Sequence, residues 1–406
     1  MTSPTPVPGD VEVVRVERPA SGGAVGRLSD GRVVFVRHAL PGELVRAVVV
    51  ERTSRFARAD ALEILEASAE RVTPPCRYAG AGGCGGCDLQ HASVPAQTSW
   101  KAALVGEHLR RIAGITRDVR VETFPAPQGS RTRLRCAVDD EGRLSLRSVR
   151  SHELVAVDPC WLADERLAPA FATSWRGADE VELRAIGDGE PFAVVRRRGA
   201  RAATDVRSLR NAAIDPTTHS RVRVGPHVFD VSPQSFWQSH RDAPAVLSEA
   251  VLAGAQVGPG DHVADLFSGV GLFAAALARA VGPRGRVSAV ESSPDAVADA
   301  RVNLDAMGAV RVRAWSVAPR AVHDAVGEGD VVVLDPPRTG LARGVAAALV
   351  QRRPRRVVYV SCDAATFARD LRNFLDGGFT LRDLRVLDLF PMTEHVELVT
   401  TLDITP

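Results

Sequence analysis

The sequence is poor in lysine and has no long apolar run. Lys101 is the only lysine among 406 residues, whereas lysine and arginine together number 51, so nearly every cation is an arginine. Guanidinium groups bind phosphates in a bidentate manner, although coding bias in an Ala- and Arg-rich genome would produce the same skew. No apolar run reaches the length of a membrane span, and the start, MTSPTPVPGD, is neither basic nor apolar. We therefore expect a soluble, cytoplasmic protein with no membrane partner.

The net charge is small and cysteines are few. A charge of +2 neither requires nor excludes nucleic acid as a partner. Six cysteines in a chain of cytoplasmic character favour metal or catalytic roles over disulfides. With 45% hydrophobic and 25% charged residues, the chain can form two or three domains that each have a core.

The pattern of strands and helices divides the chain into four parts. Residues 1–8 are rich in proline and are expected to be a disordered tail. Residues 9–66 hold five short strands separated by turn signals, which predicts a small β-barrel of the oligonucleotide-binding type. We expect residues 67–230 to form an antiparallel α+β region. Residues 231–406 alternate between strands and helices and are expected to form a doubly wound, Rossmann-like parallel sheet with a final strand hairpin.

Arginines recur along the predicted barrel and the central region. One interpretation is a groove for single-stranded RNA, and the other is a solvated arginine surface. The barrel has only two aromatic residues, Phe35 and Phe56, so we expect contacts with the RNA backbone rather than with bases. The arginines are Arg32, Arg37, Arg46, Arg52, Arg55 and Arg58 in the barrel and Arg131, Arg133, Arg135, Arg143, Arg147 and Arg150 in the central region.

A glycine-rich stretch carries Cys76, Cys84 and Cys87 with the spacing C-x7-C-x2-C. Glycines let the backbone fold closely around a cluster. A fourth thiolate is needed, and Cys160 is the candidate because Cys136 lies within a predicted strand. An iron–sulfur cluster takes four thiolates. Zinc is the alternative, but structural zinc sites usually have two paired knuckles, and this chain has a single C-x2-C.

The first strand of the carboxyl-terminal part runs into the turn DLFSGVGLFA. Gly269 and Gly271 allow a tight turn and the close approach of a ligand to the amino terminus of a helix, and Glu291, after the second strand, can bind ribose hydroxyls. This pattern alone would also suit NAD. The final strand hairpin and the stretch LDPPRTG favour S-adenosylmethionine, with Asp335 on a stiff turn that faces the crevice.

The stretch RRVVYVSCDAATFARD predicts a buried strand that ends at Cys362. Because ligands of open α/β sheets lie at the carboxyl ends of the strands, we expect this thiol to face the crevice. A small buried hydrophobe is the ordinary alternative for a lone cysteine. Glu397, at the start of the last strand, could enter the same crevice, where burial would raise its pKa. The alternative for Glu397 is a solvent-exposed strand end.

Together these pieces resemble the RNA (uracil-5-)-methyltransferases, the family that makes 5-methyluridine in ribosomal and transfer RNA. The resemblance extends over nearly the whole chain, and its last three motifs in this order are highly specific. The matching pieces are a TRAM-type barrel at 9–66, the four cysteines, Phe236-x-Gln238, DLFSGVGLF, Glu291, DPPRTG, YVSC and the tail P-x-T-x-H-V-E.

The resemblance implies Cys362 as the nucleophile and Glu397 as the proton acceptor. It also implies a [4Fe–4S] cluster on the four cysteines, which we expect to be a structural clamp. The residues implied around the methyl donor are Gln238, Phe267, Glu291 and Asp335. Two positions depart from the family pattern: Asp363-Ala364 often reads Asn-Pro, and Leu272 replaces a polar cofactor contact of some members.

The expected partner is RNA, and the joint presence of barrel and cluster favours ribosomal RNA, most of all 23S, over transfer RNA. We expect a monomer. One alternative is an RNA-binding iron–sulfur protein whose methyltransferase domain is inactive. Another is methylation of cytosine or adenine, but cytosine-5 enzymes usually place a cysteine beside the proline turn, where this chain has Asp335-Pro-Pro.

Overall fold

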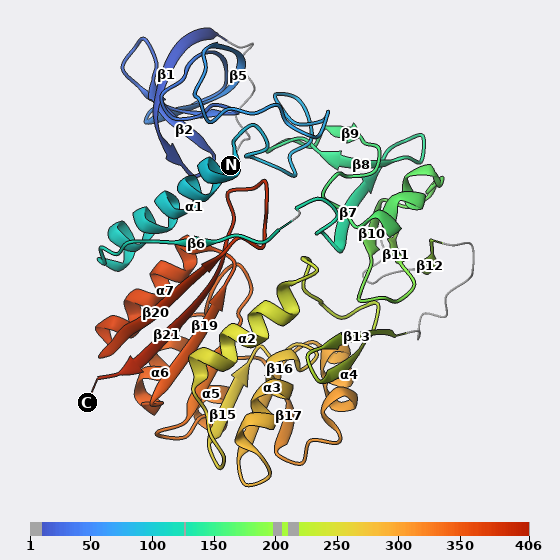
Figure 1. Cartoon of the computed structure of the whole chain (residues 1–406), viewed down its shortest axis with the longest axis vertical. Helices are drawn as coiled ribbons and strands as arrows, with labels where there is room; N and C mark the ends of the chain where they lie inside the picture. The colour runs from blue at the N-terminus through green and yellow to red at the C-terminus, as the bar shows by residue number, and fades with distance from the viewer. Residues whose placement is uncertain (1–9, 126, 198–204, 210–218, 406) are drawn as a thin grey trace.

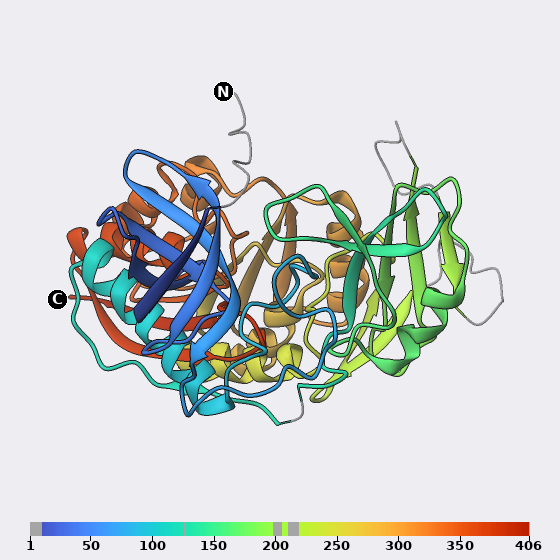
Figure 2. The same cartoon turned by 90° about the horizontal axis from the view of Figure 1, so that it is seen from above.

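The computed structural model describes residues 10–125, 127–197, 205–209 and 219–405. The expected tail at 1–8 lies outside these residues. The chain forms an amino-terminal barrel, a central antiparallel sheet and a larger carboxyl-terminal α/β unit (Figure 1). Seen from above, the barrel and the central sheet lie at opposite ends of the molecule (Figure 2).

The amino-terminal segment is a closed five-stranded barrel, as the sequence predicts. Its strands follow the order β1-β2-β3-β5-β4. Alternate residues point inward, so that Val14, Val16, Val34 and Val36 are at most 1% exposed. The strands are β1 Val11–Ala20, β2 Gly23–Arg27, β3 Val33–Arg37, β4 Leu44–Arg52 and β5 Phe56–Glu66.

Most barrel arginines have carboxylate partners. Arg37 binds Asp60 through two hydrogen bonds of 2.6 and 2.5 Å. This pairing favours the solvated-surface interpretation for these side chains, because their charge is balanced within the barrel. The other pairs are Arg32–Asp30, Arg46–Glu63, Arg52–Glu12 and Arg58–Glu51.

The central sheet has six strands in the order β12-β11-β10-β7-β8-β9. The predicted hairpin is present, because β7 and β8 pair in antiparallel fashion around the turn at 139–142. A separate hairpin, β13–β14, packs on the carboxyl-terminal unit. The elements are β7 Arg133–Val138, β8 Leu144–Arg147, β9 Leu154–Ala156, a 3₁₀ helix at Glu165–Ala172, β10 Glu180–Arg184, β11 Phe192–Arg196, β12 Asp205–Ser208, β13 Ser220–Val224 and β14 His227–Val231.

The carboxyl-terminal sheet has the order β17-β16-β15-β18-β19-β21-β20-β6. The first five strands are parallel and β21 is antiparallel, which confirms the predicted doubly wound sheet with a final hairpin. Alternate residues of each strand enter the two opposite cores. The strands are β15 His262–Leu266, β16 Arg286–Glu291, β17 Val310–Ala314, β18 Val331–Leu334, β19 Arg356–Ser361, β20 Phe379–Leu387 and β21 Glu397–Ile404.

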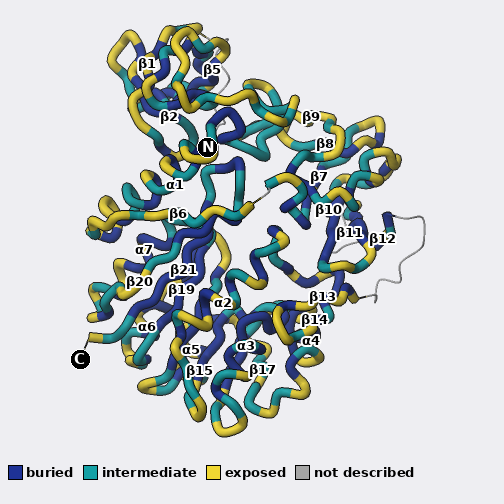
Figure 3. The backbone as a smooth tube through the Cα atoms, in the orientation of Figure 1, coloured by how far each residue is buried: buried dark blue, intermediate teal, exposed yellow. Residues whose placement is uncertain are grey.

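Helices cover both faces of this sheet, so its strands are the most deeply buried part of the chain (Figure 3). One face packs against α2, α3 and α4, and the other packs against α5, α6 and α7. In the described part of the chain, no helix has the length and apolar character needed to cross a membrane. The helices are α2 Ala243–Ala255, α3 Leu272–Val281, α4 Pro294–Leu304, α5 Pro319–Ala325, α6 Val345–Arg352 and α7 Ala364–Asp376.

The segment at 94–122 contacts the carboxyl-terminal unit, although the sequence pattern groups it with the central region at 67–230. Helix α1, Val94–His108, and the π-helical turn Leu109–Ala113 bury apolar side chains in the core shared by α5, α6 and α7. Strand β6, Val121–Glu122, then pairs in parallel with β20 at the edge of the large sheet. A two-residue strand leaves no hydrophobic periodicity in the sequence, so only the structure reveals it.

Candidate active site and cysteine site

The candidate active site lies at the carboxyl ends of the parallel strands. Strand β15 has β16 on one side and β18 on the other, so the strand order reverses next to it. Open α/β sheets bind their ligands at such a switch point. Three acidic residues lie at these strand ends: Asp265 in β15, Glu291 at the end of β16 and Asp335 directly after β18.

The glycine turn after β15 has the backbone that its sequence requires. Gly269 and Gly271 have φ values of 55° and 95°, and a Cβ on Gly271 would lie 2.7 Å from Cδ1 of Leu304. Phe267 also has a positive φ, 68°, and its N–H donates to the carbonyl of Val290 at 2.9 Å. The turn is therefore tied to β16, the strand that carries Glu291.

Glu291 fastens this turn from the other side. One carboxylate oxygen accepts a 3.0 Å hydrogen bond from the N–H of Gly269. The other oxygen accepts from the N–H groups of Ser292 and Ser293 at 2.6 and 2.7 Å. The carboxylate is thus fixed beside the glycine turn, where its remaining lone pairs could accept hydrogen bonds from a ligand.

Asp265 is a candidate residue that the sequence prediction did not include. It is 0% exposed, and neither of its carboxylate oxygens has a hydrogen-bond partner among the described residues. Burial, followed by the charge of Asp335, raises the pKa of Asp265 to about 8, while the backbone N–H of Ala274 opposes this rise. An unpartnered buried carboxyl group is costly, so its position suits a ligand that donates hydrogen bonds. Its place near the end of the first parallel strand was the available sequence signal.

Asp335 begins the DPPRTG turn, which is fastened to α7. The hydroxyl of Thr366 donates to the carbonyl of Arg338 at 3.0 Å, and the N–H of Leu341 donates to Asp370 at 2.8 Å. Burial raises the pKa of Asp335 to about 7. Because α7 begins two residues after Cys362, one helix positions both the DPPRTG turn and the thiol.

Cys362 and Glu397 lie opposite each other. Strands β19 and β21 pair in antiparallel fashion up to Ser361 and Leu398. Continuing this register by one residue places Cys362 across from Glu397, and directly opposite residues of an antiparallel pair share one face of the sheet. Cys362 is partly exposed, whereas Glu397 is only 5% exposed. The structure therefore brings together the two residues that the sequence singled out for catalysis.

The electrostatics of this pair are strongly perturbed. Burial, and then the charge of Glu397, raise the pKa of Cys362 to about 11. Burial, and then the charge of Asp335, raise the pKa of Glu397 well above its usual value. Arg338 opposes both effects and is the second residue that the sequence prediction missed. It lies three positions after Asp335, so the DPPRTG motif itself was the signal.

Asp363 and Ala364 follow the thiol where the family pattern often has Asn-Pro, and the contacts of Asp363 show how the loop is stabilised without them. Its side chain accepts a 2.8 Å hydrogen bond from the N–H of Thr366 and so caps α7. Its backbone is extended, with φ −136° and ψ 112°. Ala364 is the first helical residue, where a proline would lack only an N–H that has no partner within the helix. The loop is therefore stabilised by a cap.

Gln238, another predicted cofactor residue, lies on a segment that is bound to the central sheet. Its carbonyl accepts a 3.2 Å hydrogen bond from Thr132, and the N–H of Thr132 donates to the carbonyl of Ser239 at 2.8 Å. Among the hydrogen bonds of the described residues, none joins its side-chain amide to the glycine turn or to Asp335. The structure thus anchors Gln238 to the central sheet and does not by itself bring its side chain to the other predicted cofactor residues.

The four predicted cysteines line one cavity. Cys76, Cys84, Cys87 and Cys160 surround it together with Arg131, and none of these cysteines forms a disulfide. No group of three or more metal-binding side chains within the described ranges has the geometry of a ready metal site. The cavity nevertheless gathers four thiols from two segments that are more than 70 residues apart in sequence.

The chemistry of this cavity fits a thiolate-bound cluster. The N–H of Gly86 points at Sγ of Cys84 at 3.3 Å. Burial raises the pKa of both Cys84 and Cys87, and the charge of Arg131 opposes this rise. Amide groups and a nearby cation stabilise clustered thiolates. Cys136 lies close by on β7 but is 0% exposed and does not line the cavity.

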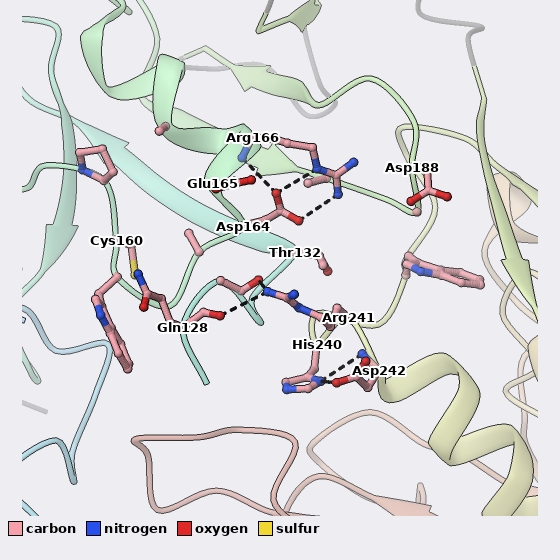
Figure 4. Close-up of a pocket in the computed structure, with 18 of the residues that line it drawn as sticks. Gln128, Thr132, Cys160, Asp164, Glu165, Arg166, Asp188, His240, Arg241 and Asp242 are labelled. Atoms are coloured by element: carbon pink, nitrogen blue, oxygen red, sulfur yellow. Dashed lines mark hydrogen bonds and ion pairs between the residues drawn. The ribbon is translucent and has the colours of Figure 1, made fainter. Parts of the chain in front are cut away.

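A larger cavity separates the cysteine segment from α2. Figure 4 shows Arg166 paired with Asp164, Arg241 bound to carbonyl oxygens and His240 facing Asp242. Its lining contains five arginines and five acidic residues. The cavity therefore has no excess of positive charge, and its lining includes neither Cys362 nor Glu397.

The glycine turn at the switch point, the acidic residues at three strand ends and the antiparallel final hairpin define an S-adenosylmethionine-dependent methyltransferase. Residues 227–403 match the family model described as tRNA (uracil-5-)-methyltransferase, and residues 8–62 match the TRAM domain. The chain belongs to the RNA (uracil-5-)-methyltransferase family, as its motifs predict. The predicted TRAM barrel is likewise confirmed.

Relatives match over nearly the full length. An uncharacterized RNA methyltransferase of Streptomyces coelicolor is 40% identical over 99% of this chain and 95% of its own length. The 23S rRNA (uracil(1939)-C(5))-methyltransferase RlmD of Halomonas elongata is 34% identical over 94% of this chain and 87% of its own length. The fold resembles the Pyrococcus abyssi tRNA (uracil-54, C5)-methyltransferase in complex with S-adenosyl-L-homocysteine, with a TM-score of 0.71, 23% identity and coverage of 96% and 100% of the two chains.

Proposed function

We propose that this methyltransferase transfers the methyl group of S-adenosylmethionine to carbon 5 of a uridine in RNA through a covalent adduct with Cys362. The observation that carries the proposal is the register of β19 and β21, which extends to a thiol opposite a buried carboxyl group. Membership of the uracil-5-methyltransferase family supports uracil as the base.

In the proposed mechanism the two residues act in sequence. The Cys362 thiolate adds to carbon 6 of uracil, and the ring becomes an enolate with a nucleophilic carbon 5. S-adenosylmethionine supplies the electrophilic methyl group that carbon 5 takes. Glu397 then accepts the proton from carbon 5, the double bond between carbons 5 and 6 re-forms, and the carbon–sulfur bond breaks to release the thiolate. The target base must first leave its stack to reach the thiol.

The charges of the site support these roles. A carboxyl group with a raised pKa holds a proton more strongly, which suits Glu397 as the acceptor. Burial and the charge of Glu397 raise the pKa of Cys362, and Arg338 is the cation that opposes this rise and favours the thiolate. The pocket thus contains both a proton acceptor and a cation that promotes the nucleophile.

We propose that the methyl donor lies against the glycine turn at the switch point. The unpartnered carboxyl group of Asp265 and the fixed carboxylate of Glu291 would accept hydrogen bonds from its polar groups. The residues proposed to contact it are Gln238, Phe267, Gly269, Gly271, Glu291, Asp335 and Asp265.

We propose that Cys76, Cys84, Cys87 and Cys160 hold a [4Fe–4S] cluster. Such a cluster would fasten the glycine-rich loop at 76–87 to the segment near Cys160. The methyl transfer described above needs no redox step, so the proposed role is structural. Zinc on the same thiolates is the alternative, and metal analysis of protein purified without oxygen separates the two.

The proposed substrate is 23S ribosomal RNA. The RlmD relative, whose name specifies that RNA, matches nearly the whole chain at 34% identity. Transfer RNA is the second candidate, because the structural neighbour from Pyrococcus abyssi is a transfer-RNA enzyme of the same fold. Position-resolved mapping of 5-methyluridine in a strain that lacks the gene distinguishes the two.

The covalent mechanism is tested with a Cys362→Ala variant and a labelled methyl donor. We expect methyl transfer to RNA to be abolished, while calorimetric binding of S-adenosylhomocysteine stays within about threefold of the native value, because Cys362 is not among the residues proposed to contact the donor. Undiminished methyl transfer would contradict the proposal.

A further inference from the structure

The loop that precedes Glu397, residues 388–396, is held by segments far away in the sequence. It joins β20 to β21 and extends from the sheet toward α1 (Figure 1). Helix α1, the cysteine segment and the barrel each form hydrogen bonds with it. The position of Glu397 therefore depends on contacts outside the sheet that carries it.

Lys101 and Gln97 on α1 form the innermost of these contacts. The ammonium group of Lys101 is 0% exposed, is paired with the carboxylate of Asp388 and donates to the carbonyl of Phe390 at 3.0 Å. One turn earlier, the side-chain oxygen of Gln97 accepts from the N–H of Met392 at 3.2 Å. Two side chains of one helix thus hold the loop at three points.

The cysteine segment and the barrel hold the outer part of the loop. The N–H groups of Asp88 and Leu89 both donate to the carbonyl of Met392 at 2.9 Å. Met392 has a φ of 65°, an uncommon value for a non-glycine residue, so its conformation depends on these contacts. The carboxylate of Glu394 accepts from the hydroxyl of Ser21 at 2.9 Å and the N–H of Gly22 at 2.8 Å.

The buried ammonium group is costly, which suggests that it serves more than packing. Burial lowers the pKa of Lys101, while the charge and hydrogen bond of Asp388 raise it. A buried ion pair adds little to stability compared with apolar packing but can specify one arrangement of the chain. Lys101 is the only lysine of the chain, and it places a compact ammonium group in the interior, whereas every other Lys/Arg position holds the planar guanidinium of arginine.

We propose that Lys101 is a positioning residue for proton removal: through Asp388 and Phe390 it holds the 388–396 loop so that Glu397 stays opposite Cys362. The proposal rests on the proposed function, in which Glu397 accepts the proton from carbon 5. It predicts a defect in one step. Adduct formation needs Cys362, whereas breakdown of the methylated adduct needs Glu397 in place.

The test is the Lys101→Met variant in single-turnover reactions with RNA and labelled S-adenosylmethionine. The covalent protein–RNA adduct is quantified on denaturing gels and the released methylated RNA by its label. We expect adduct formation within about threefold of the native rate and adduct breakdown slowed by about tenfold or more, because a small displacement of a catalytic group has large effects. In steady state kcat should fall and the KM values should fall with it, so that kcat/KM stays within about threefold, because the slowed step follows methyl transfer.

Equal slowing of both steps, or native breakdown kinetics, would overturn the proposal. Gln97→Met should slow breakdown in the same direction, because it removes the contact with Met392. Ser99→Ala, an exposed position on the same helix, should leave both rates unchanged. If Glu397→Gln does not accumulate adduct, the proposed function fails; if it does and Lys101→Met does not, only the positioning role fails.

A double variant, Lys101→Met with Asp388→Asn, controls for folding. It leaves no unpaired carboxylate in the interior, so we expect it to recover most of the thermal stability that the single variant loses. Adduct breakdown should remain slow, because the carbonyl of Phe390 still lacks its donor. Recovery of native breakdown in the double variant would show that only the unpaired charge mattered and would overturn the proposal.

Discussion

Cys362 and Glu397 extend the same antiparallel pair, the one that joins Ser361 to Leu398. A thiol after one strand and a carboxyl group at the start of another thus share one face of the sheet, although they are 35 positions apart in sequence. After burial, the charge of Glu397 is the largest cause that disfavours ionisation of Cys362, because like charges repel in a buried site.

The reactivity of Cys362 should respond to its two charged neighbours. With a pKa of about 11, Cys362 is mostly a thiol at neutral pH, and its thiolate fraction increases as the pH approaches that value. Glu397→Gln removes a negative charge and should lower that pKa, so alkylation at a fixed pH of about 9 should be faster by about threefold or more. Arg338→Met should have the opposite effect. Iodoacetamide labelling, followed by mass spectrometry of the peptide that contains Cys362, measures both, and identical pH profiles would contradict this account.

Asp265 should reduce the stability of the ligand-free protein. Its pKa is raised from 3.8 to about 8, so between these values the folded protein binds a proton that the unfolded chain has released. The free energy of unfolding should therefore fall as the pH rises from about 4 to 8. Asp265→Asn should reduce this slope and raise the melting temperature at pH 8. Asp305→Asn, at an exposed position, is the control and should leave the slope unchanged.

Asp265→Asn should also weaken cofactor binding. Asp265 has no hydrogen-bond partner in the described part of the chain, so we expect a ligand to supply one. Loss of a charged acceptor should reduce the affinity for S-adenosylhomocysteine by about 2 kcal/mol, which is a factor of about 30. Native affinity should also increase as the pH rises through about 7 to 8, where Asp335 and Asp265 lose their protons. Calorimetry across this range measures both effects.

Replacing Cys160 and replacing Cys136 should have different effects on bound iron. Cys160 lines the cavity, whereas Cys136 is buried next to it and does not. Cys160→Ser should lose most of the bound iron and the visible absorbance of the protein when it is purified without oxygen. Cys136→Ala should keep both, although removal of a buried thiol would lower stability by about 1 kcal/mol. Equal iron content in the two variants would contradict the assignment.

Ala364 should accept a proline, the residue that the family pattern often has after the thiol loop. The preceding residue, Asp363, already has the extended backbone that a residue before proline requires. Ala364→Pro should raise the free energy of unfolding by about 0.5 kcal/mol by restricting the unfolded chain. Asp363→Ala should lower it by about 1 kcal/mol, because the cap of α7 is lost. Chemical denaturation measures both, and destabilisation by the proline would contradict the capping argument.

Local sequence determined much of the architecture and most candidates for the site. Alternating apolar residues predicted the barrel strands, and β-branched runs predicted β15 to β19, because strand periodicity is a local property. The glycines of the DLFSGVGLFA turn predicted a positive φ, and Gly269 and Gly271 both have one. Cys362, Glu397, Glu291 and Asp335 all stood at predicted strand ends, where sheet chemistry places ligands.

Only the tertiary structure decided which distant groups meet and what charge they carry. Strand register set Cys362 opposite Glu397, and burial raised the pKa of Asp265, which no local pattern reveals. The pairing of barrel arginines with carboxylates also depends on strands that the sequence separates. Lys101 is the clearest case. The sequence shows only that it is the single lysine, whereas the fold places its ammonium group in the interior beside Asp388. Long-range packing, and not local preference, determines which charges are buried.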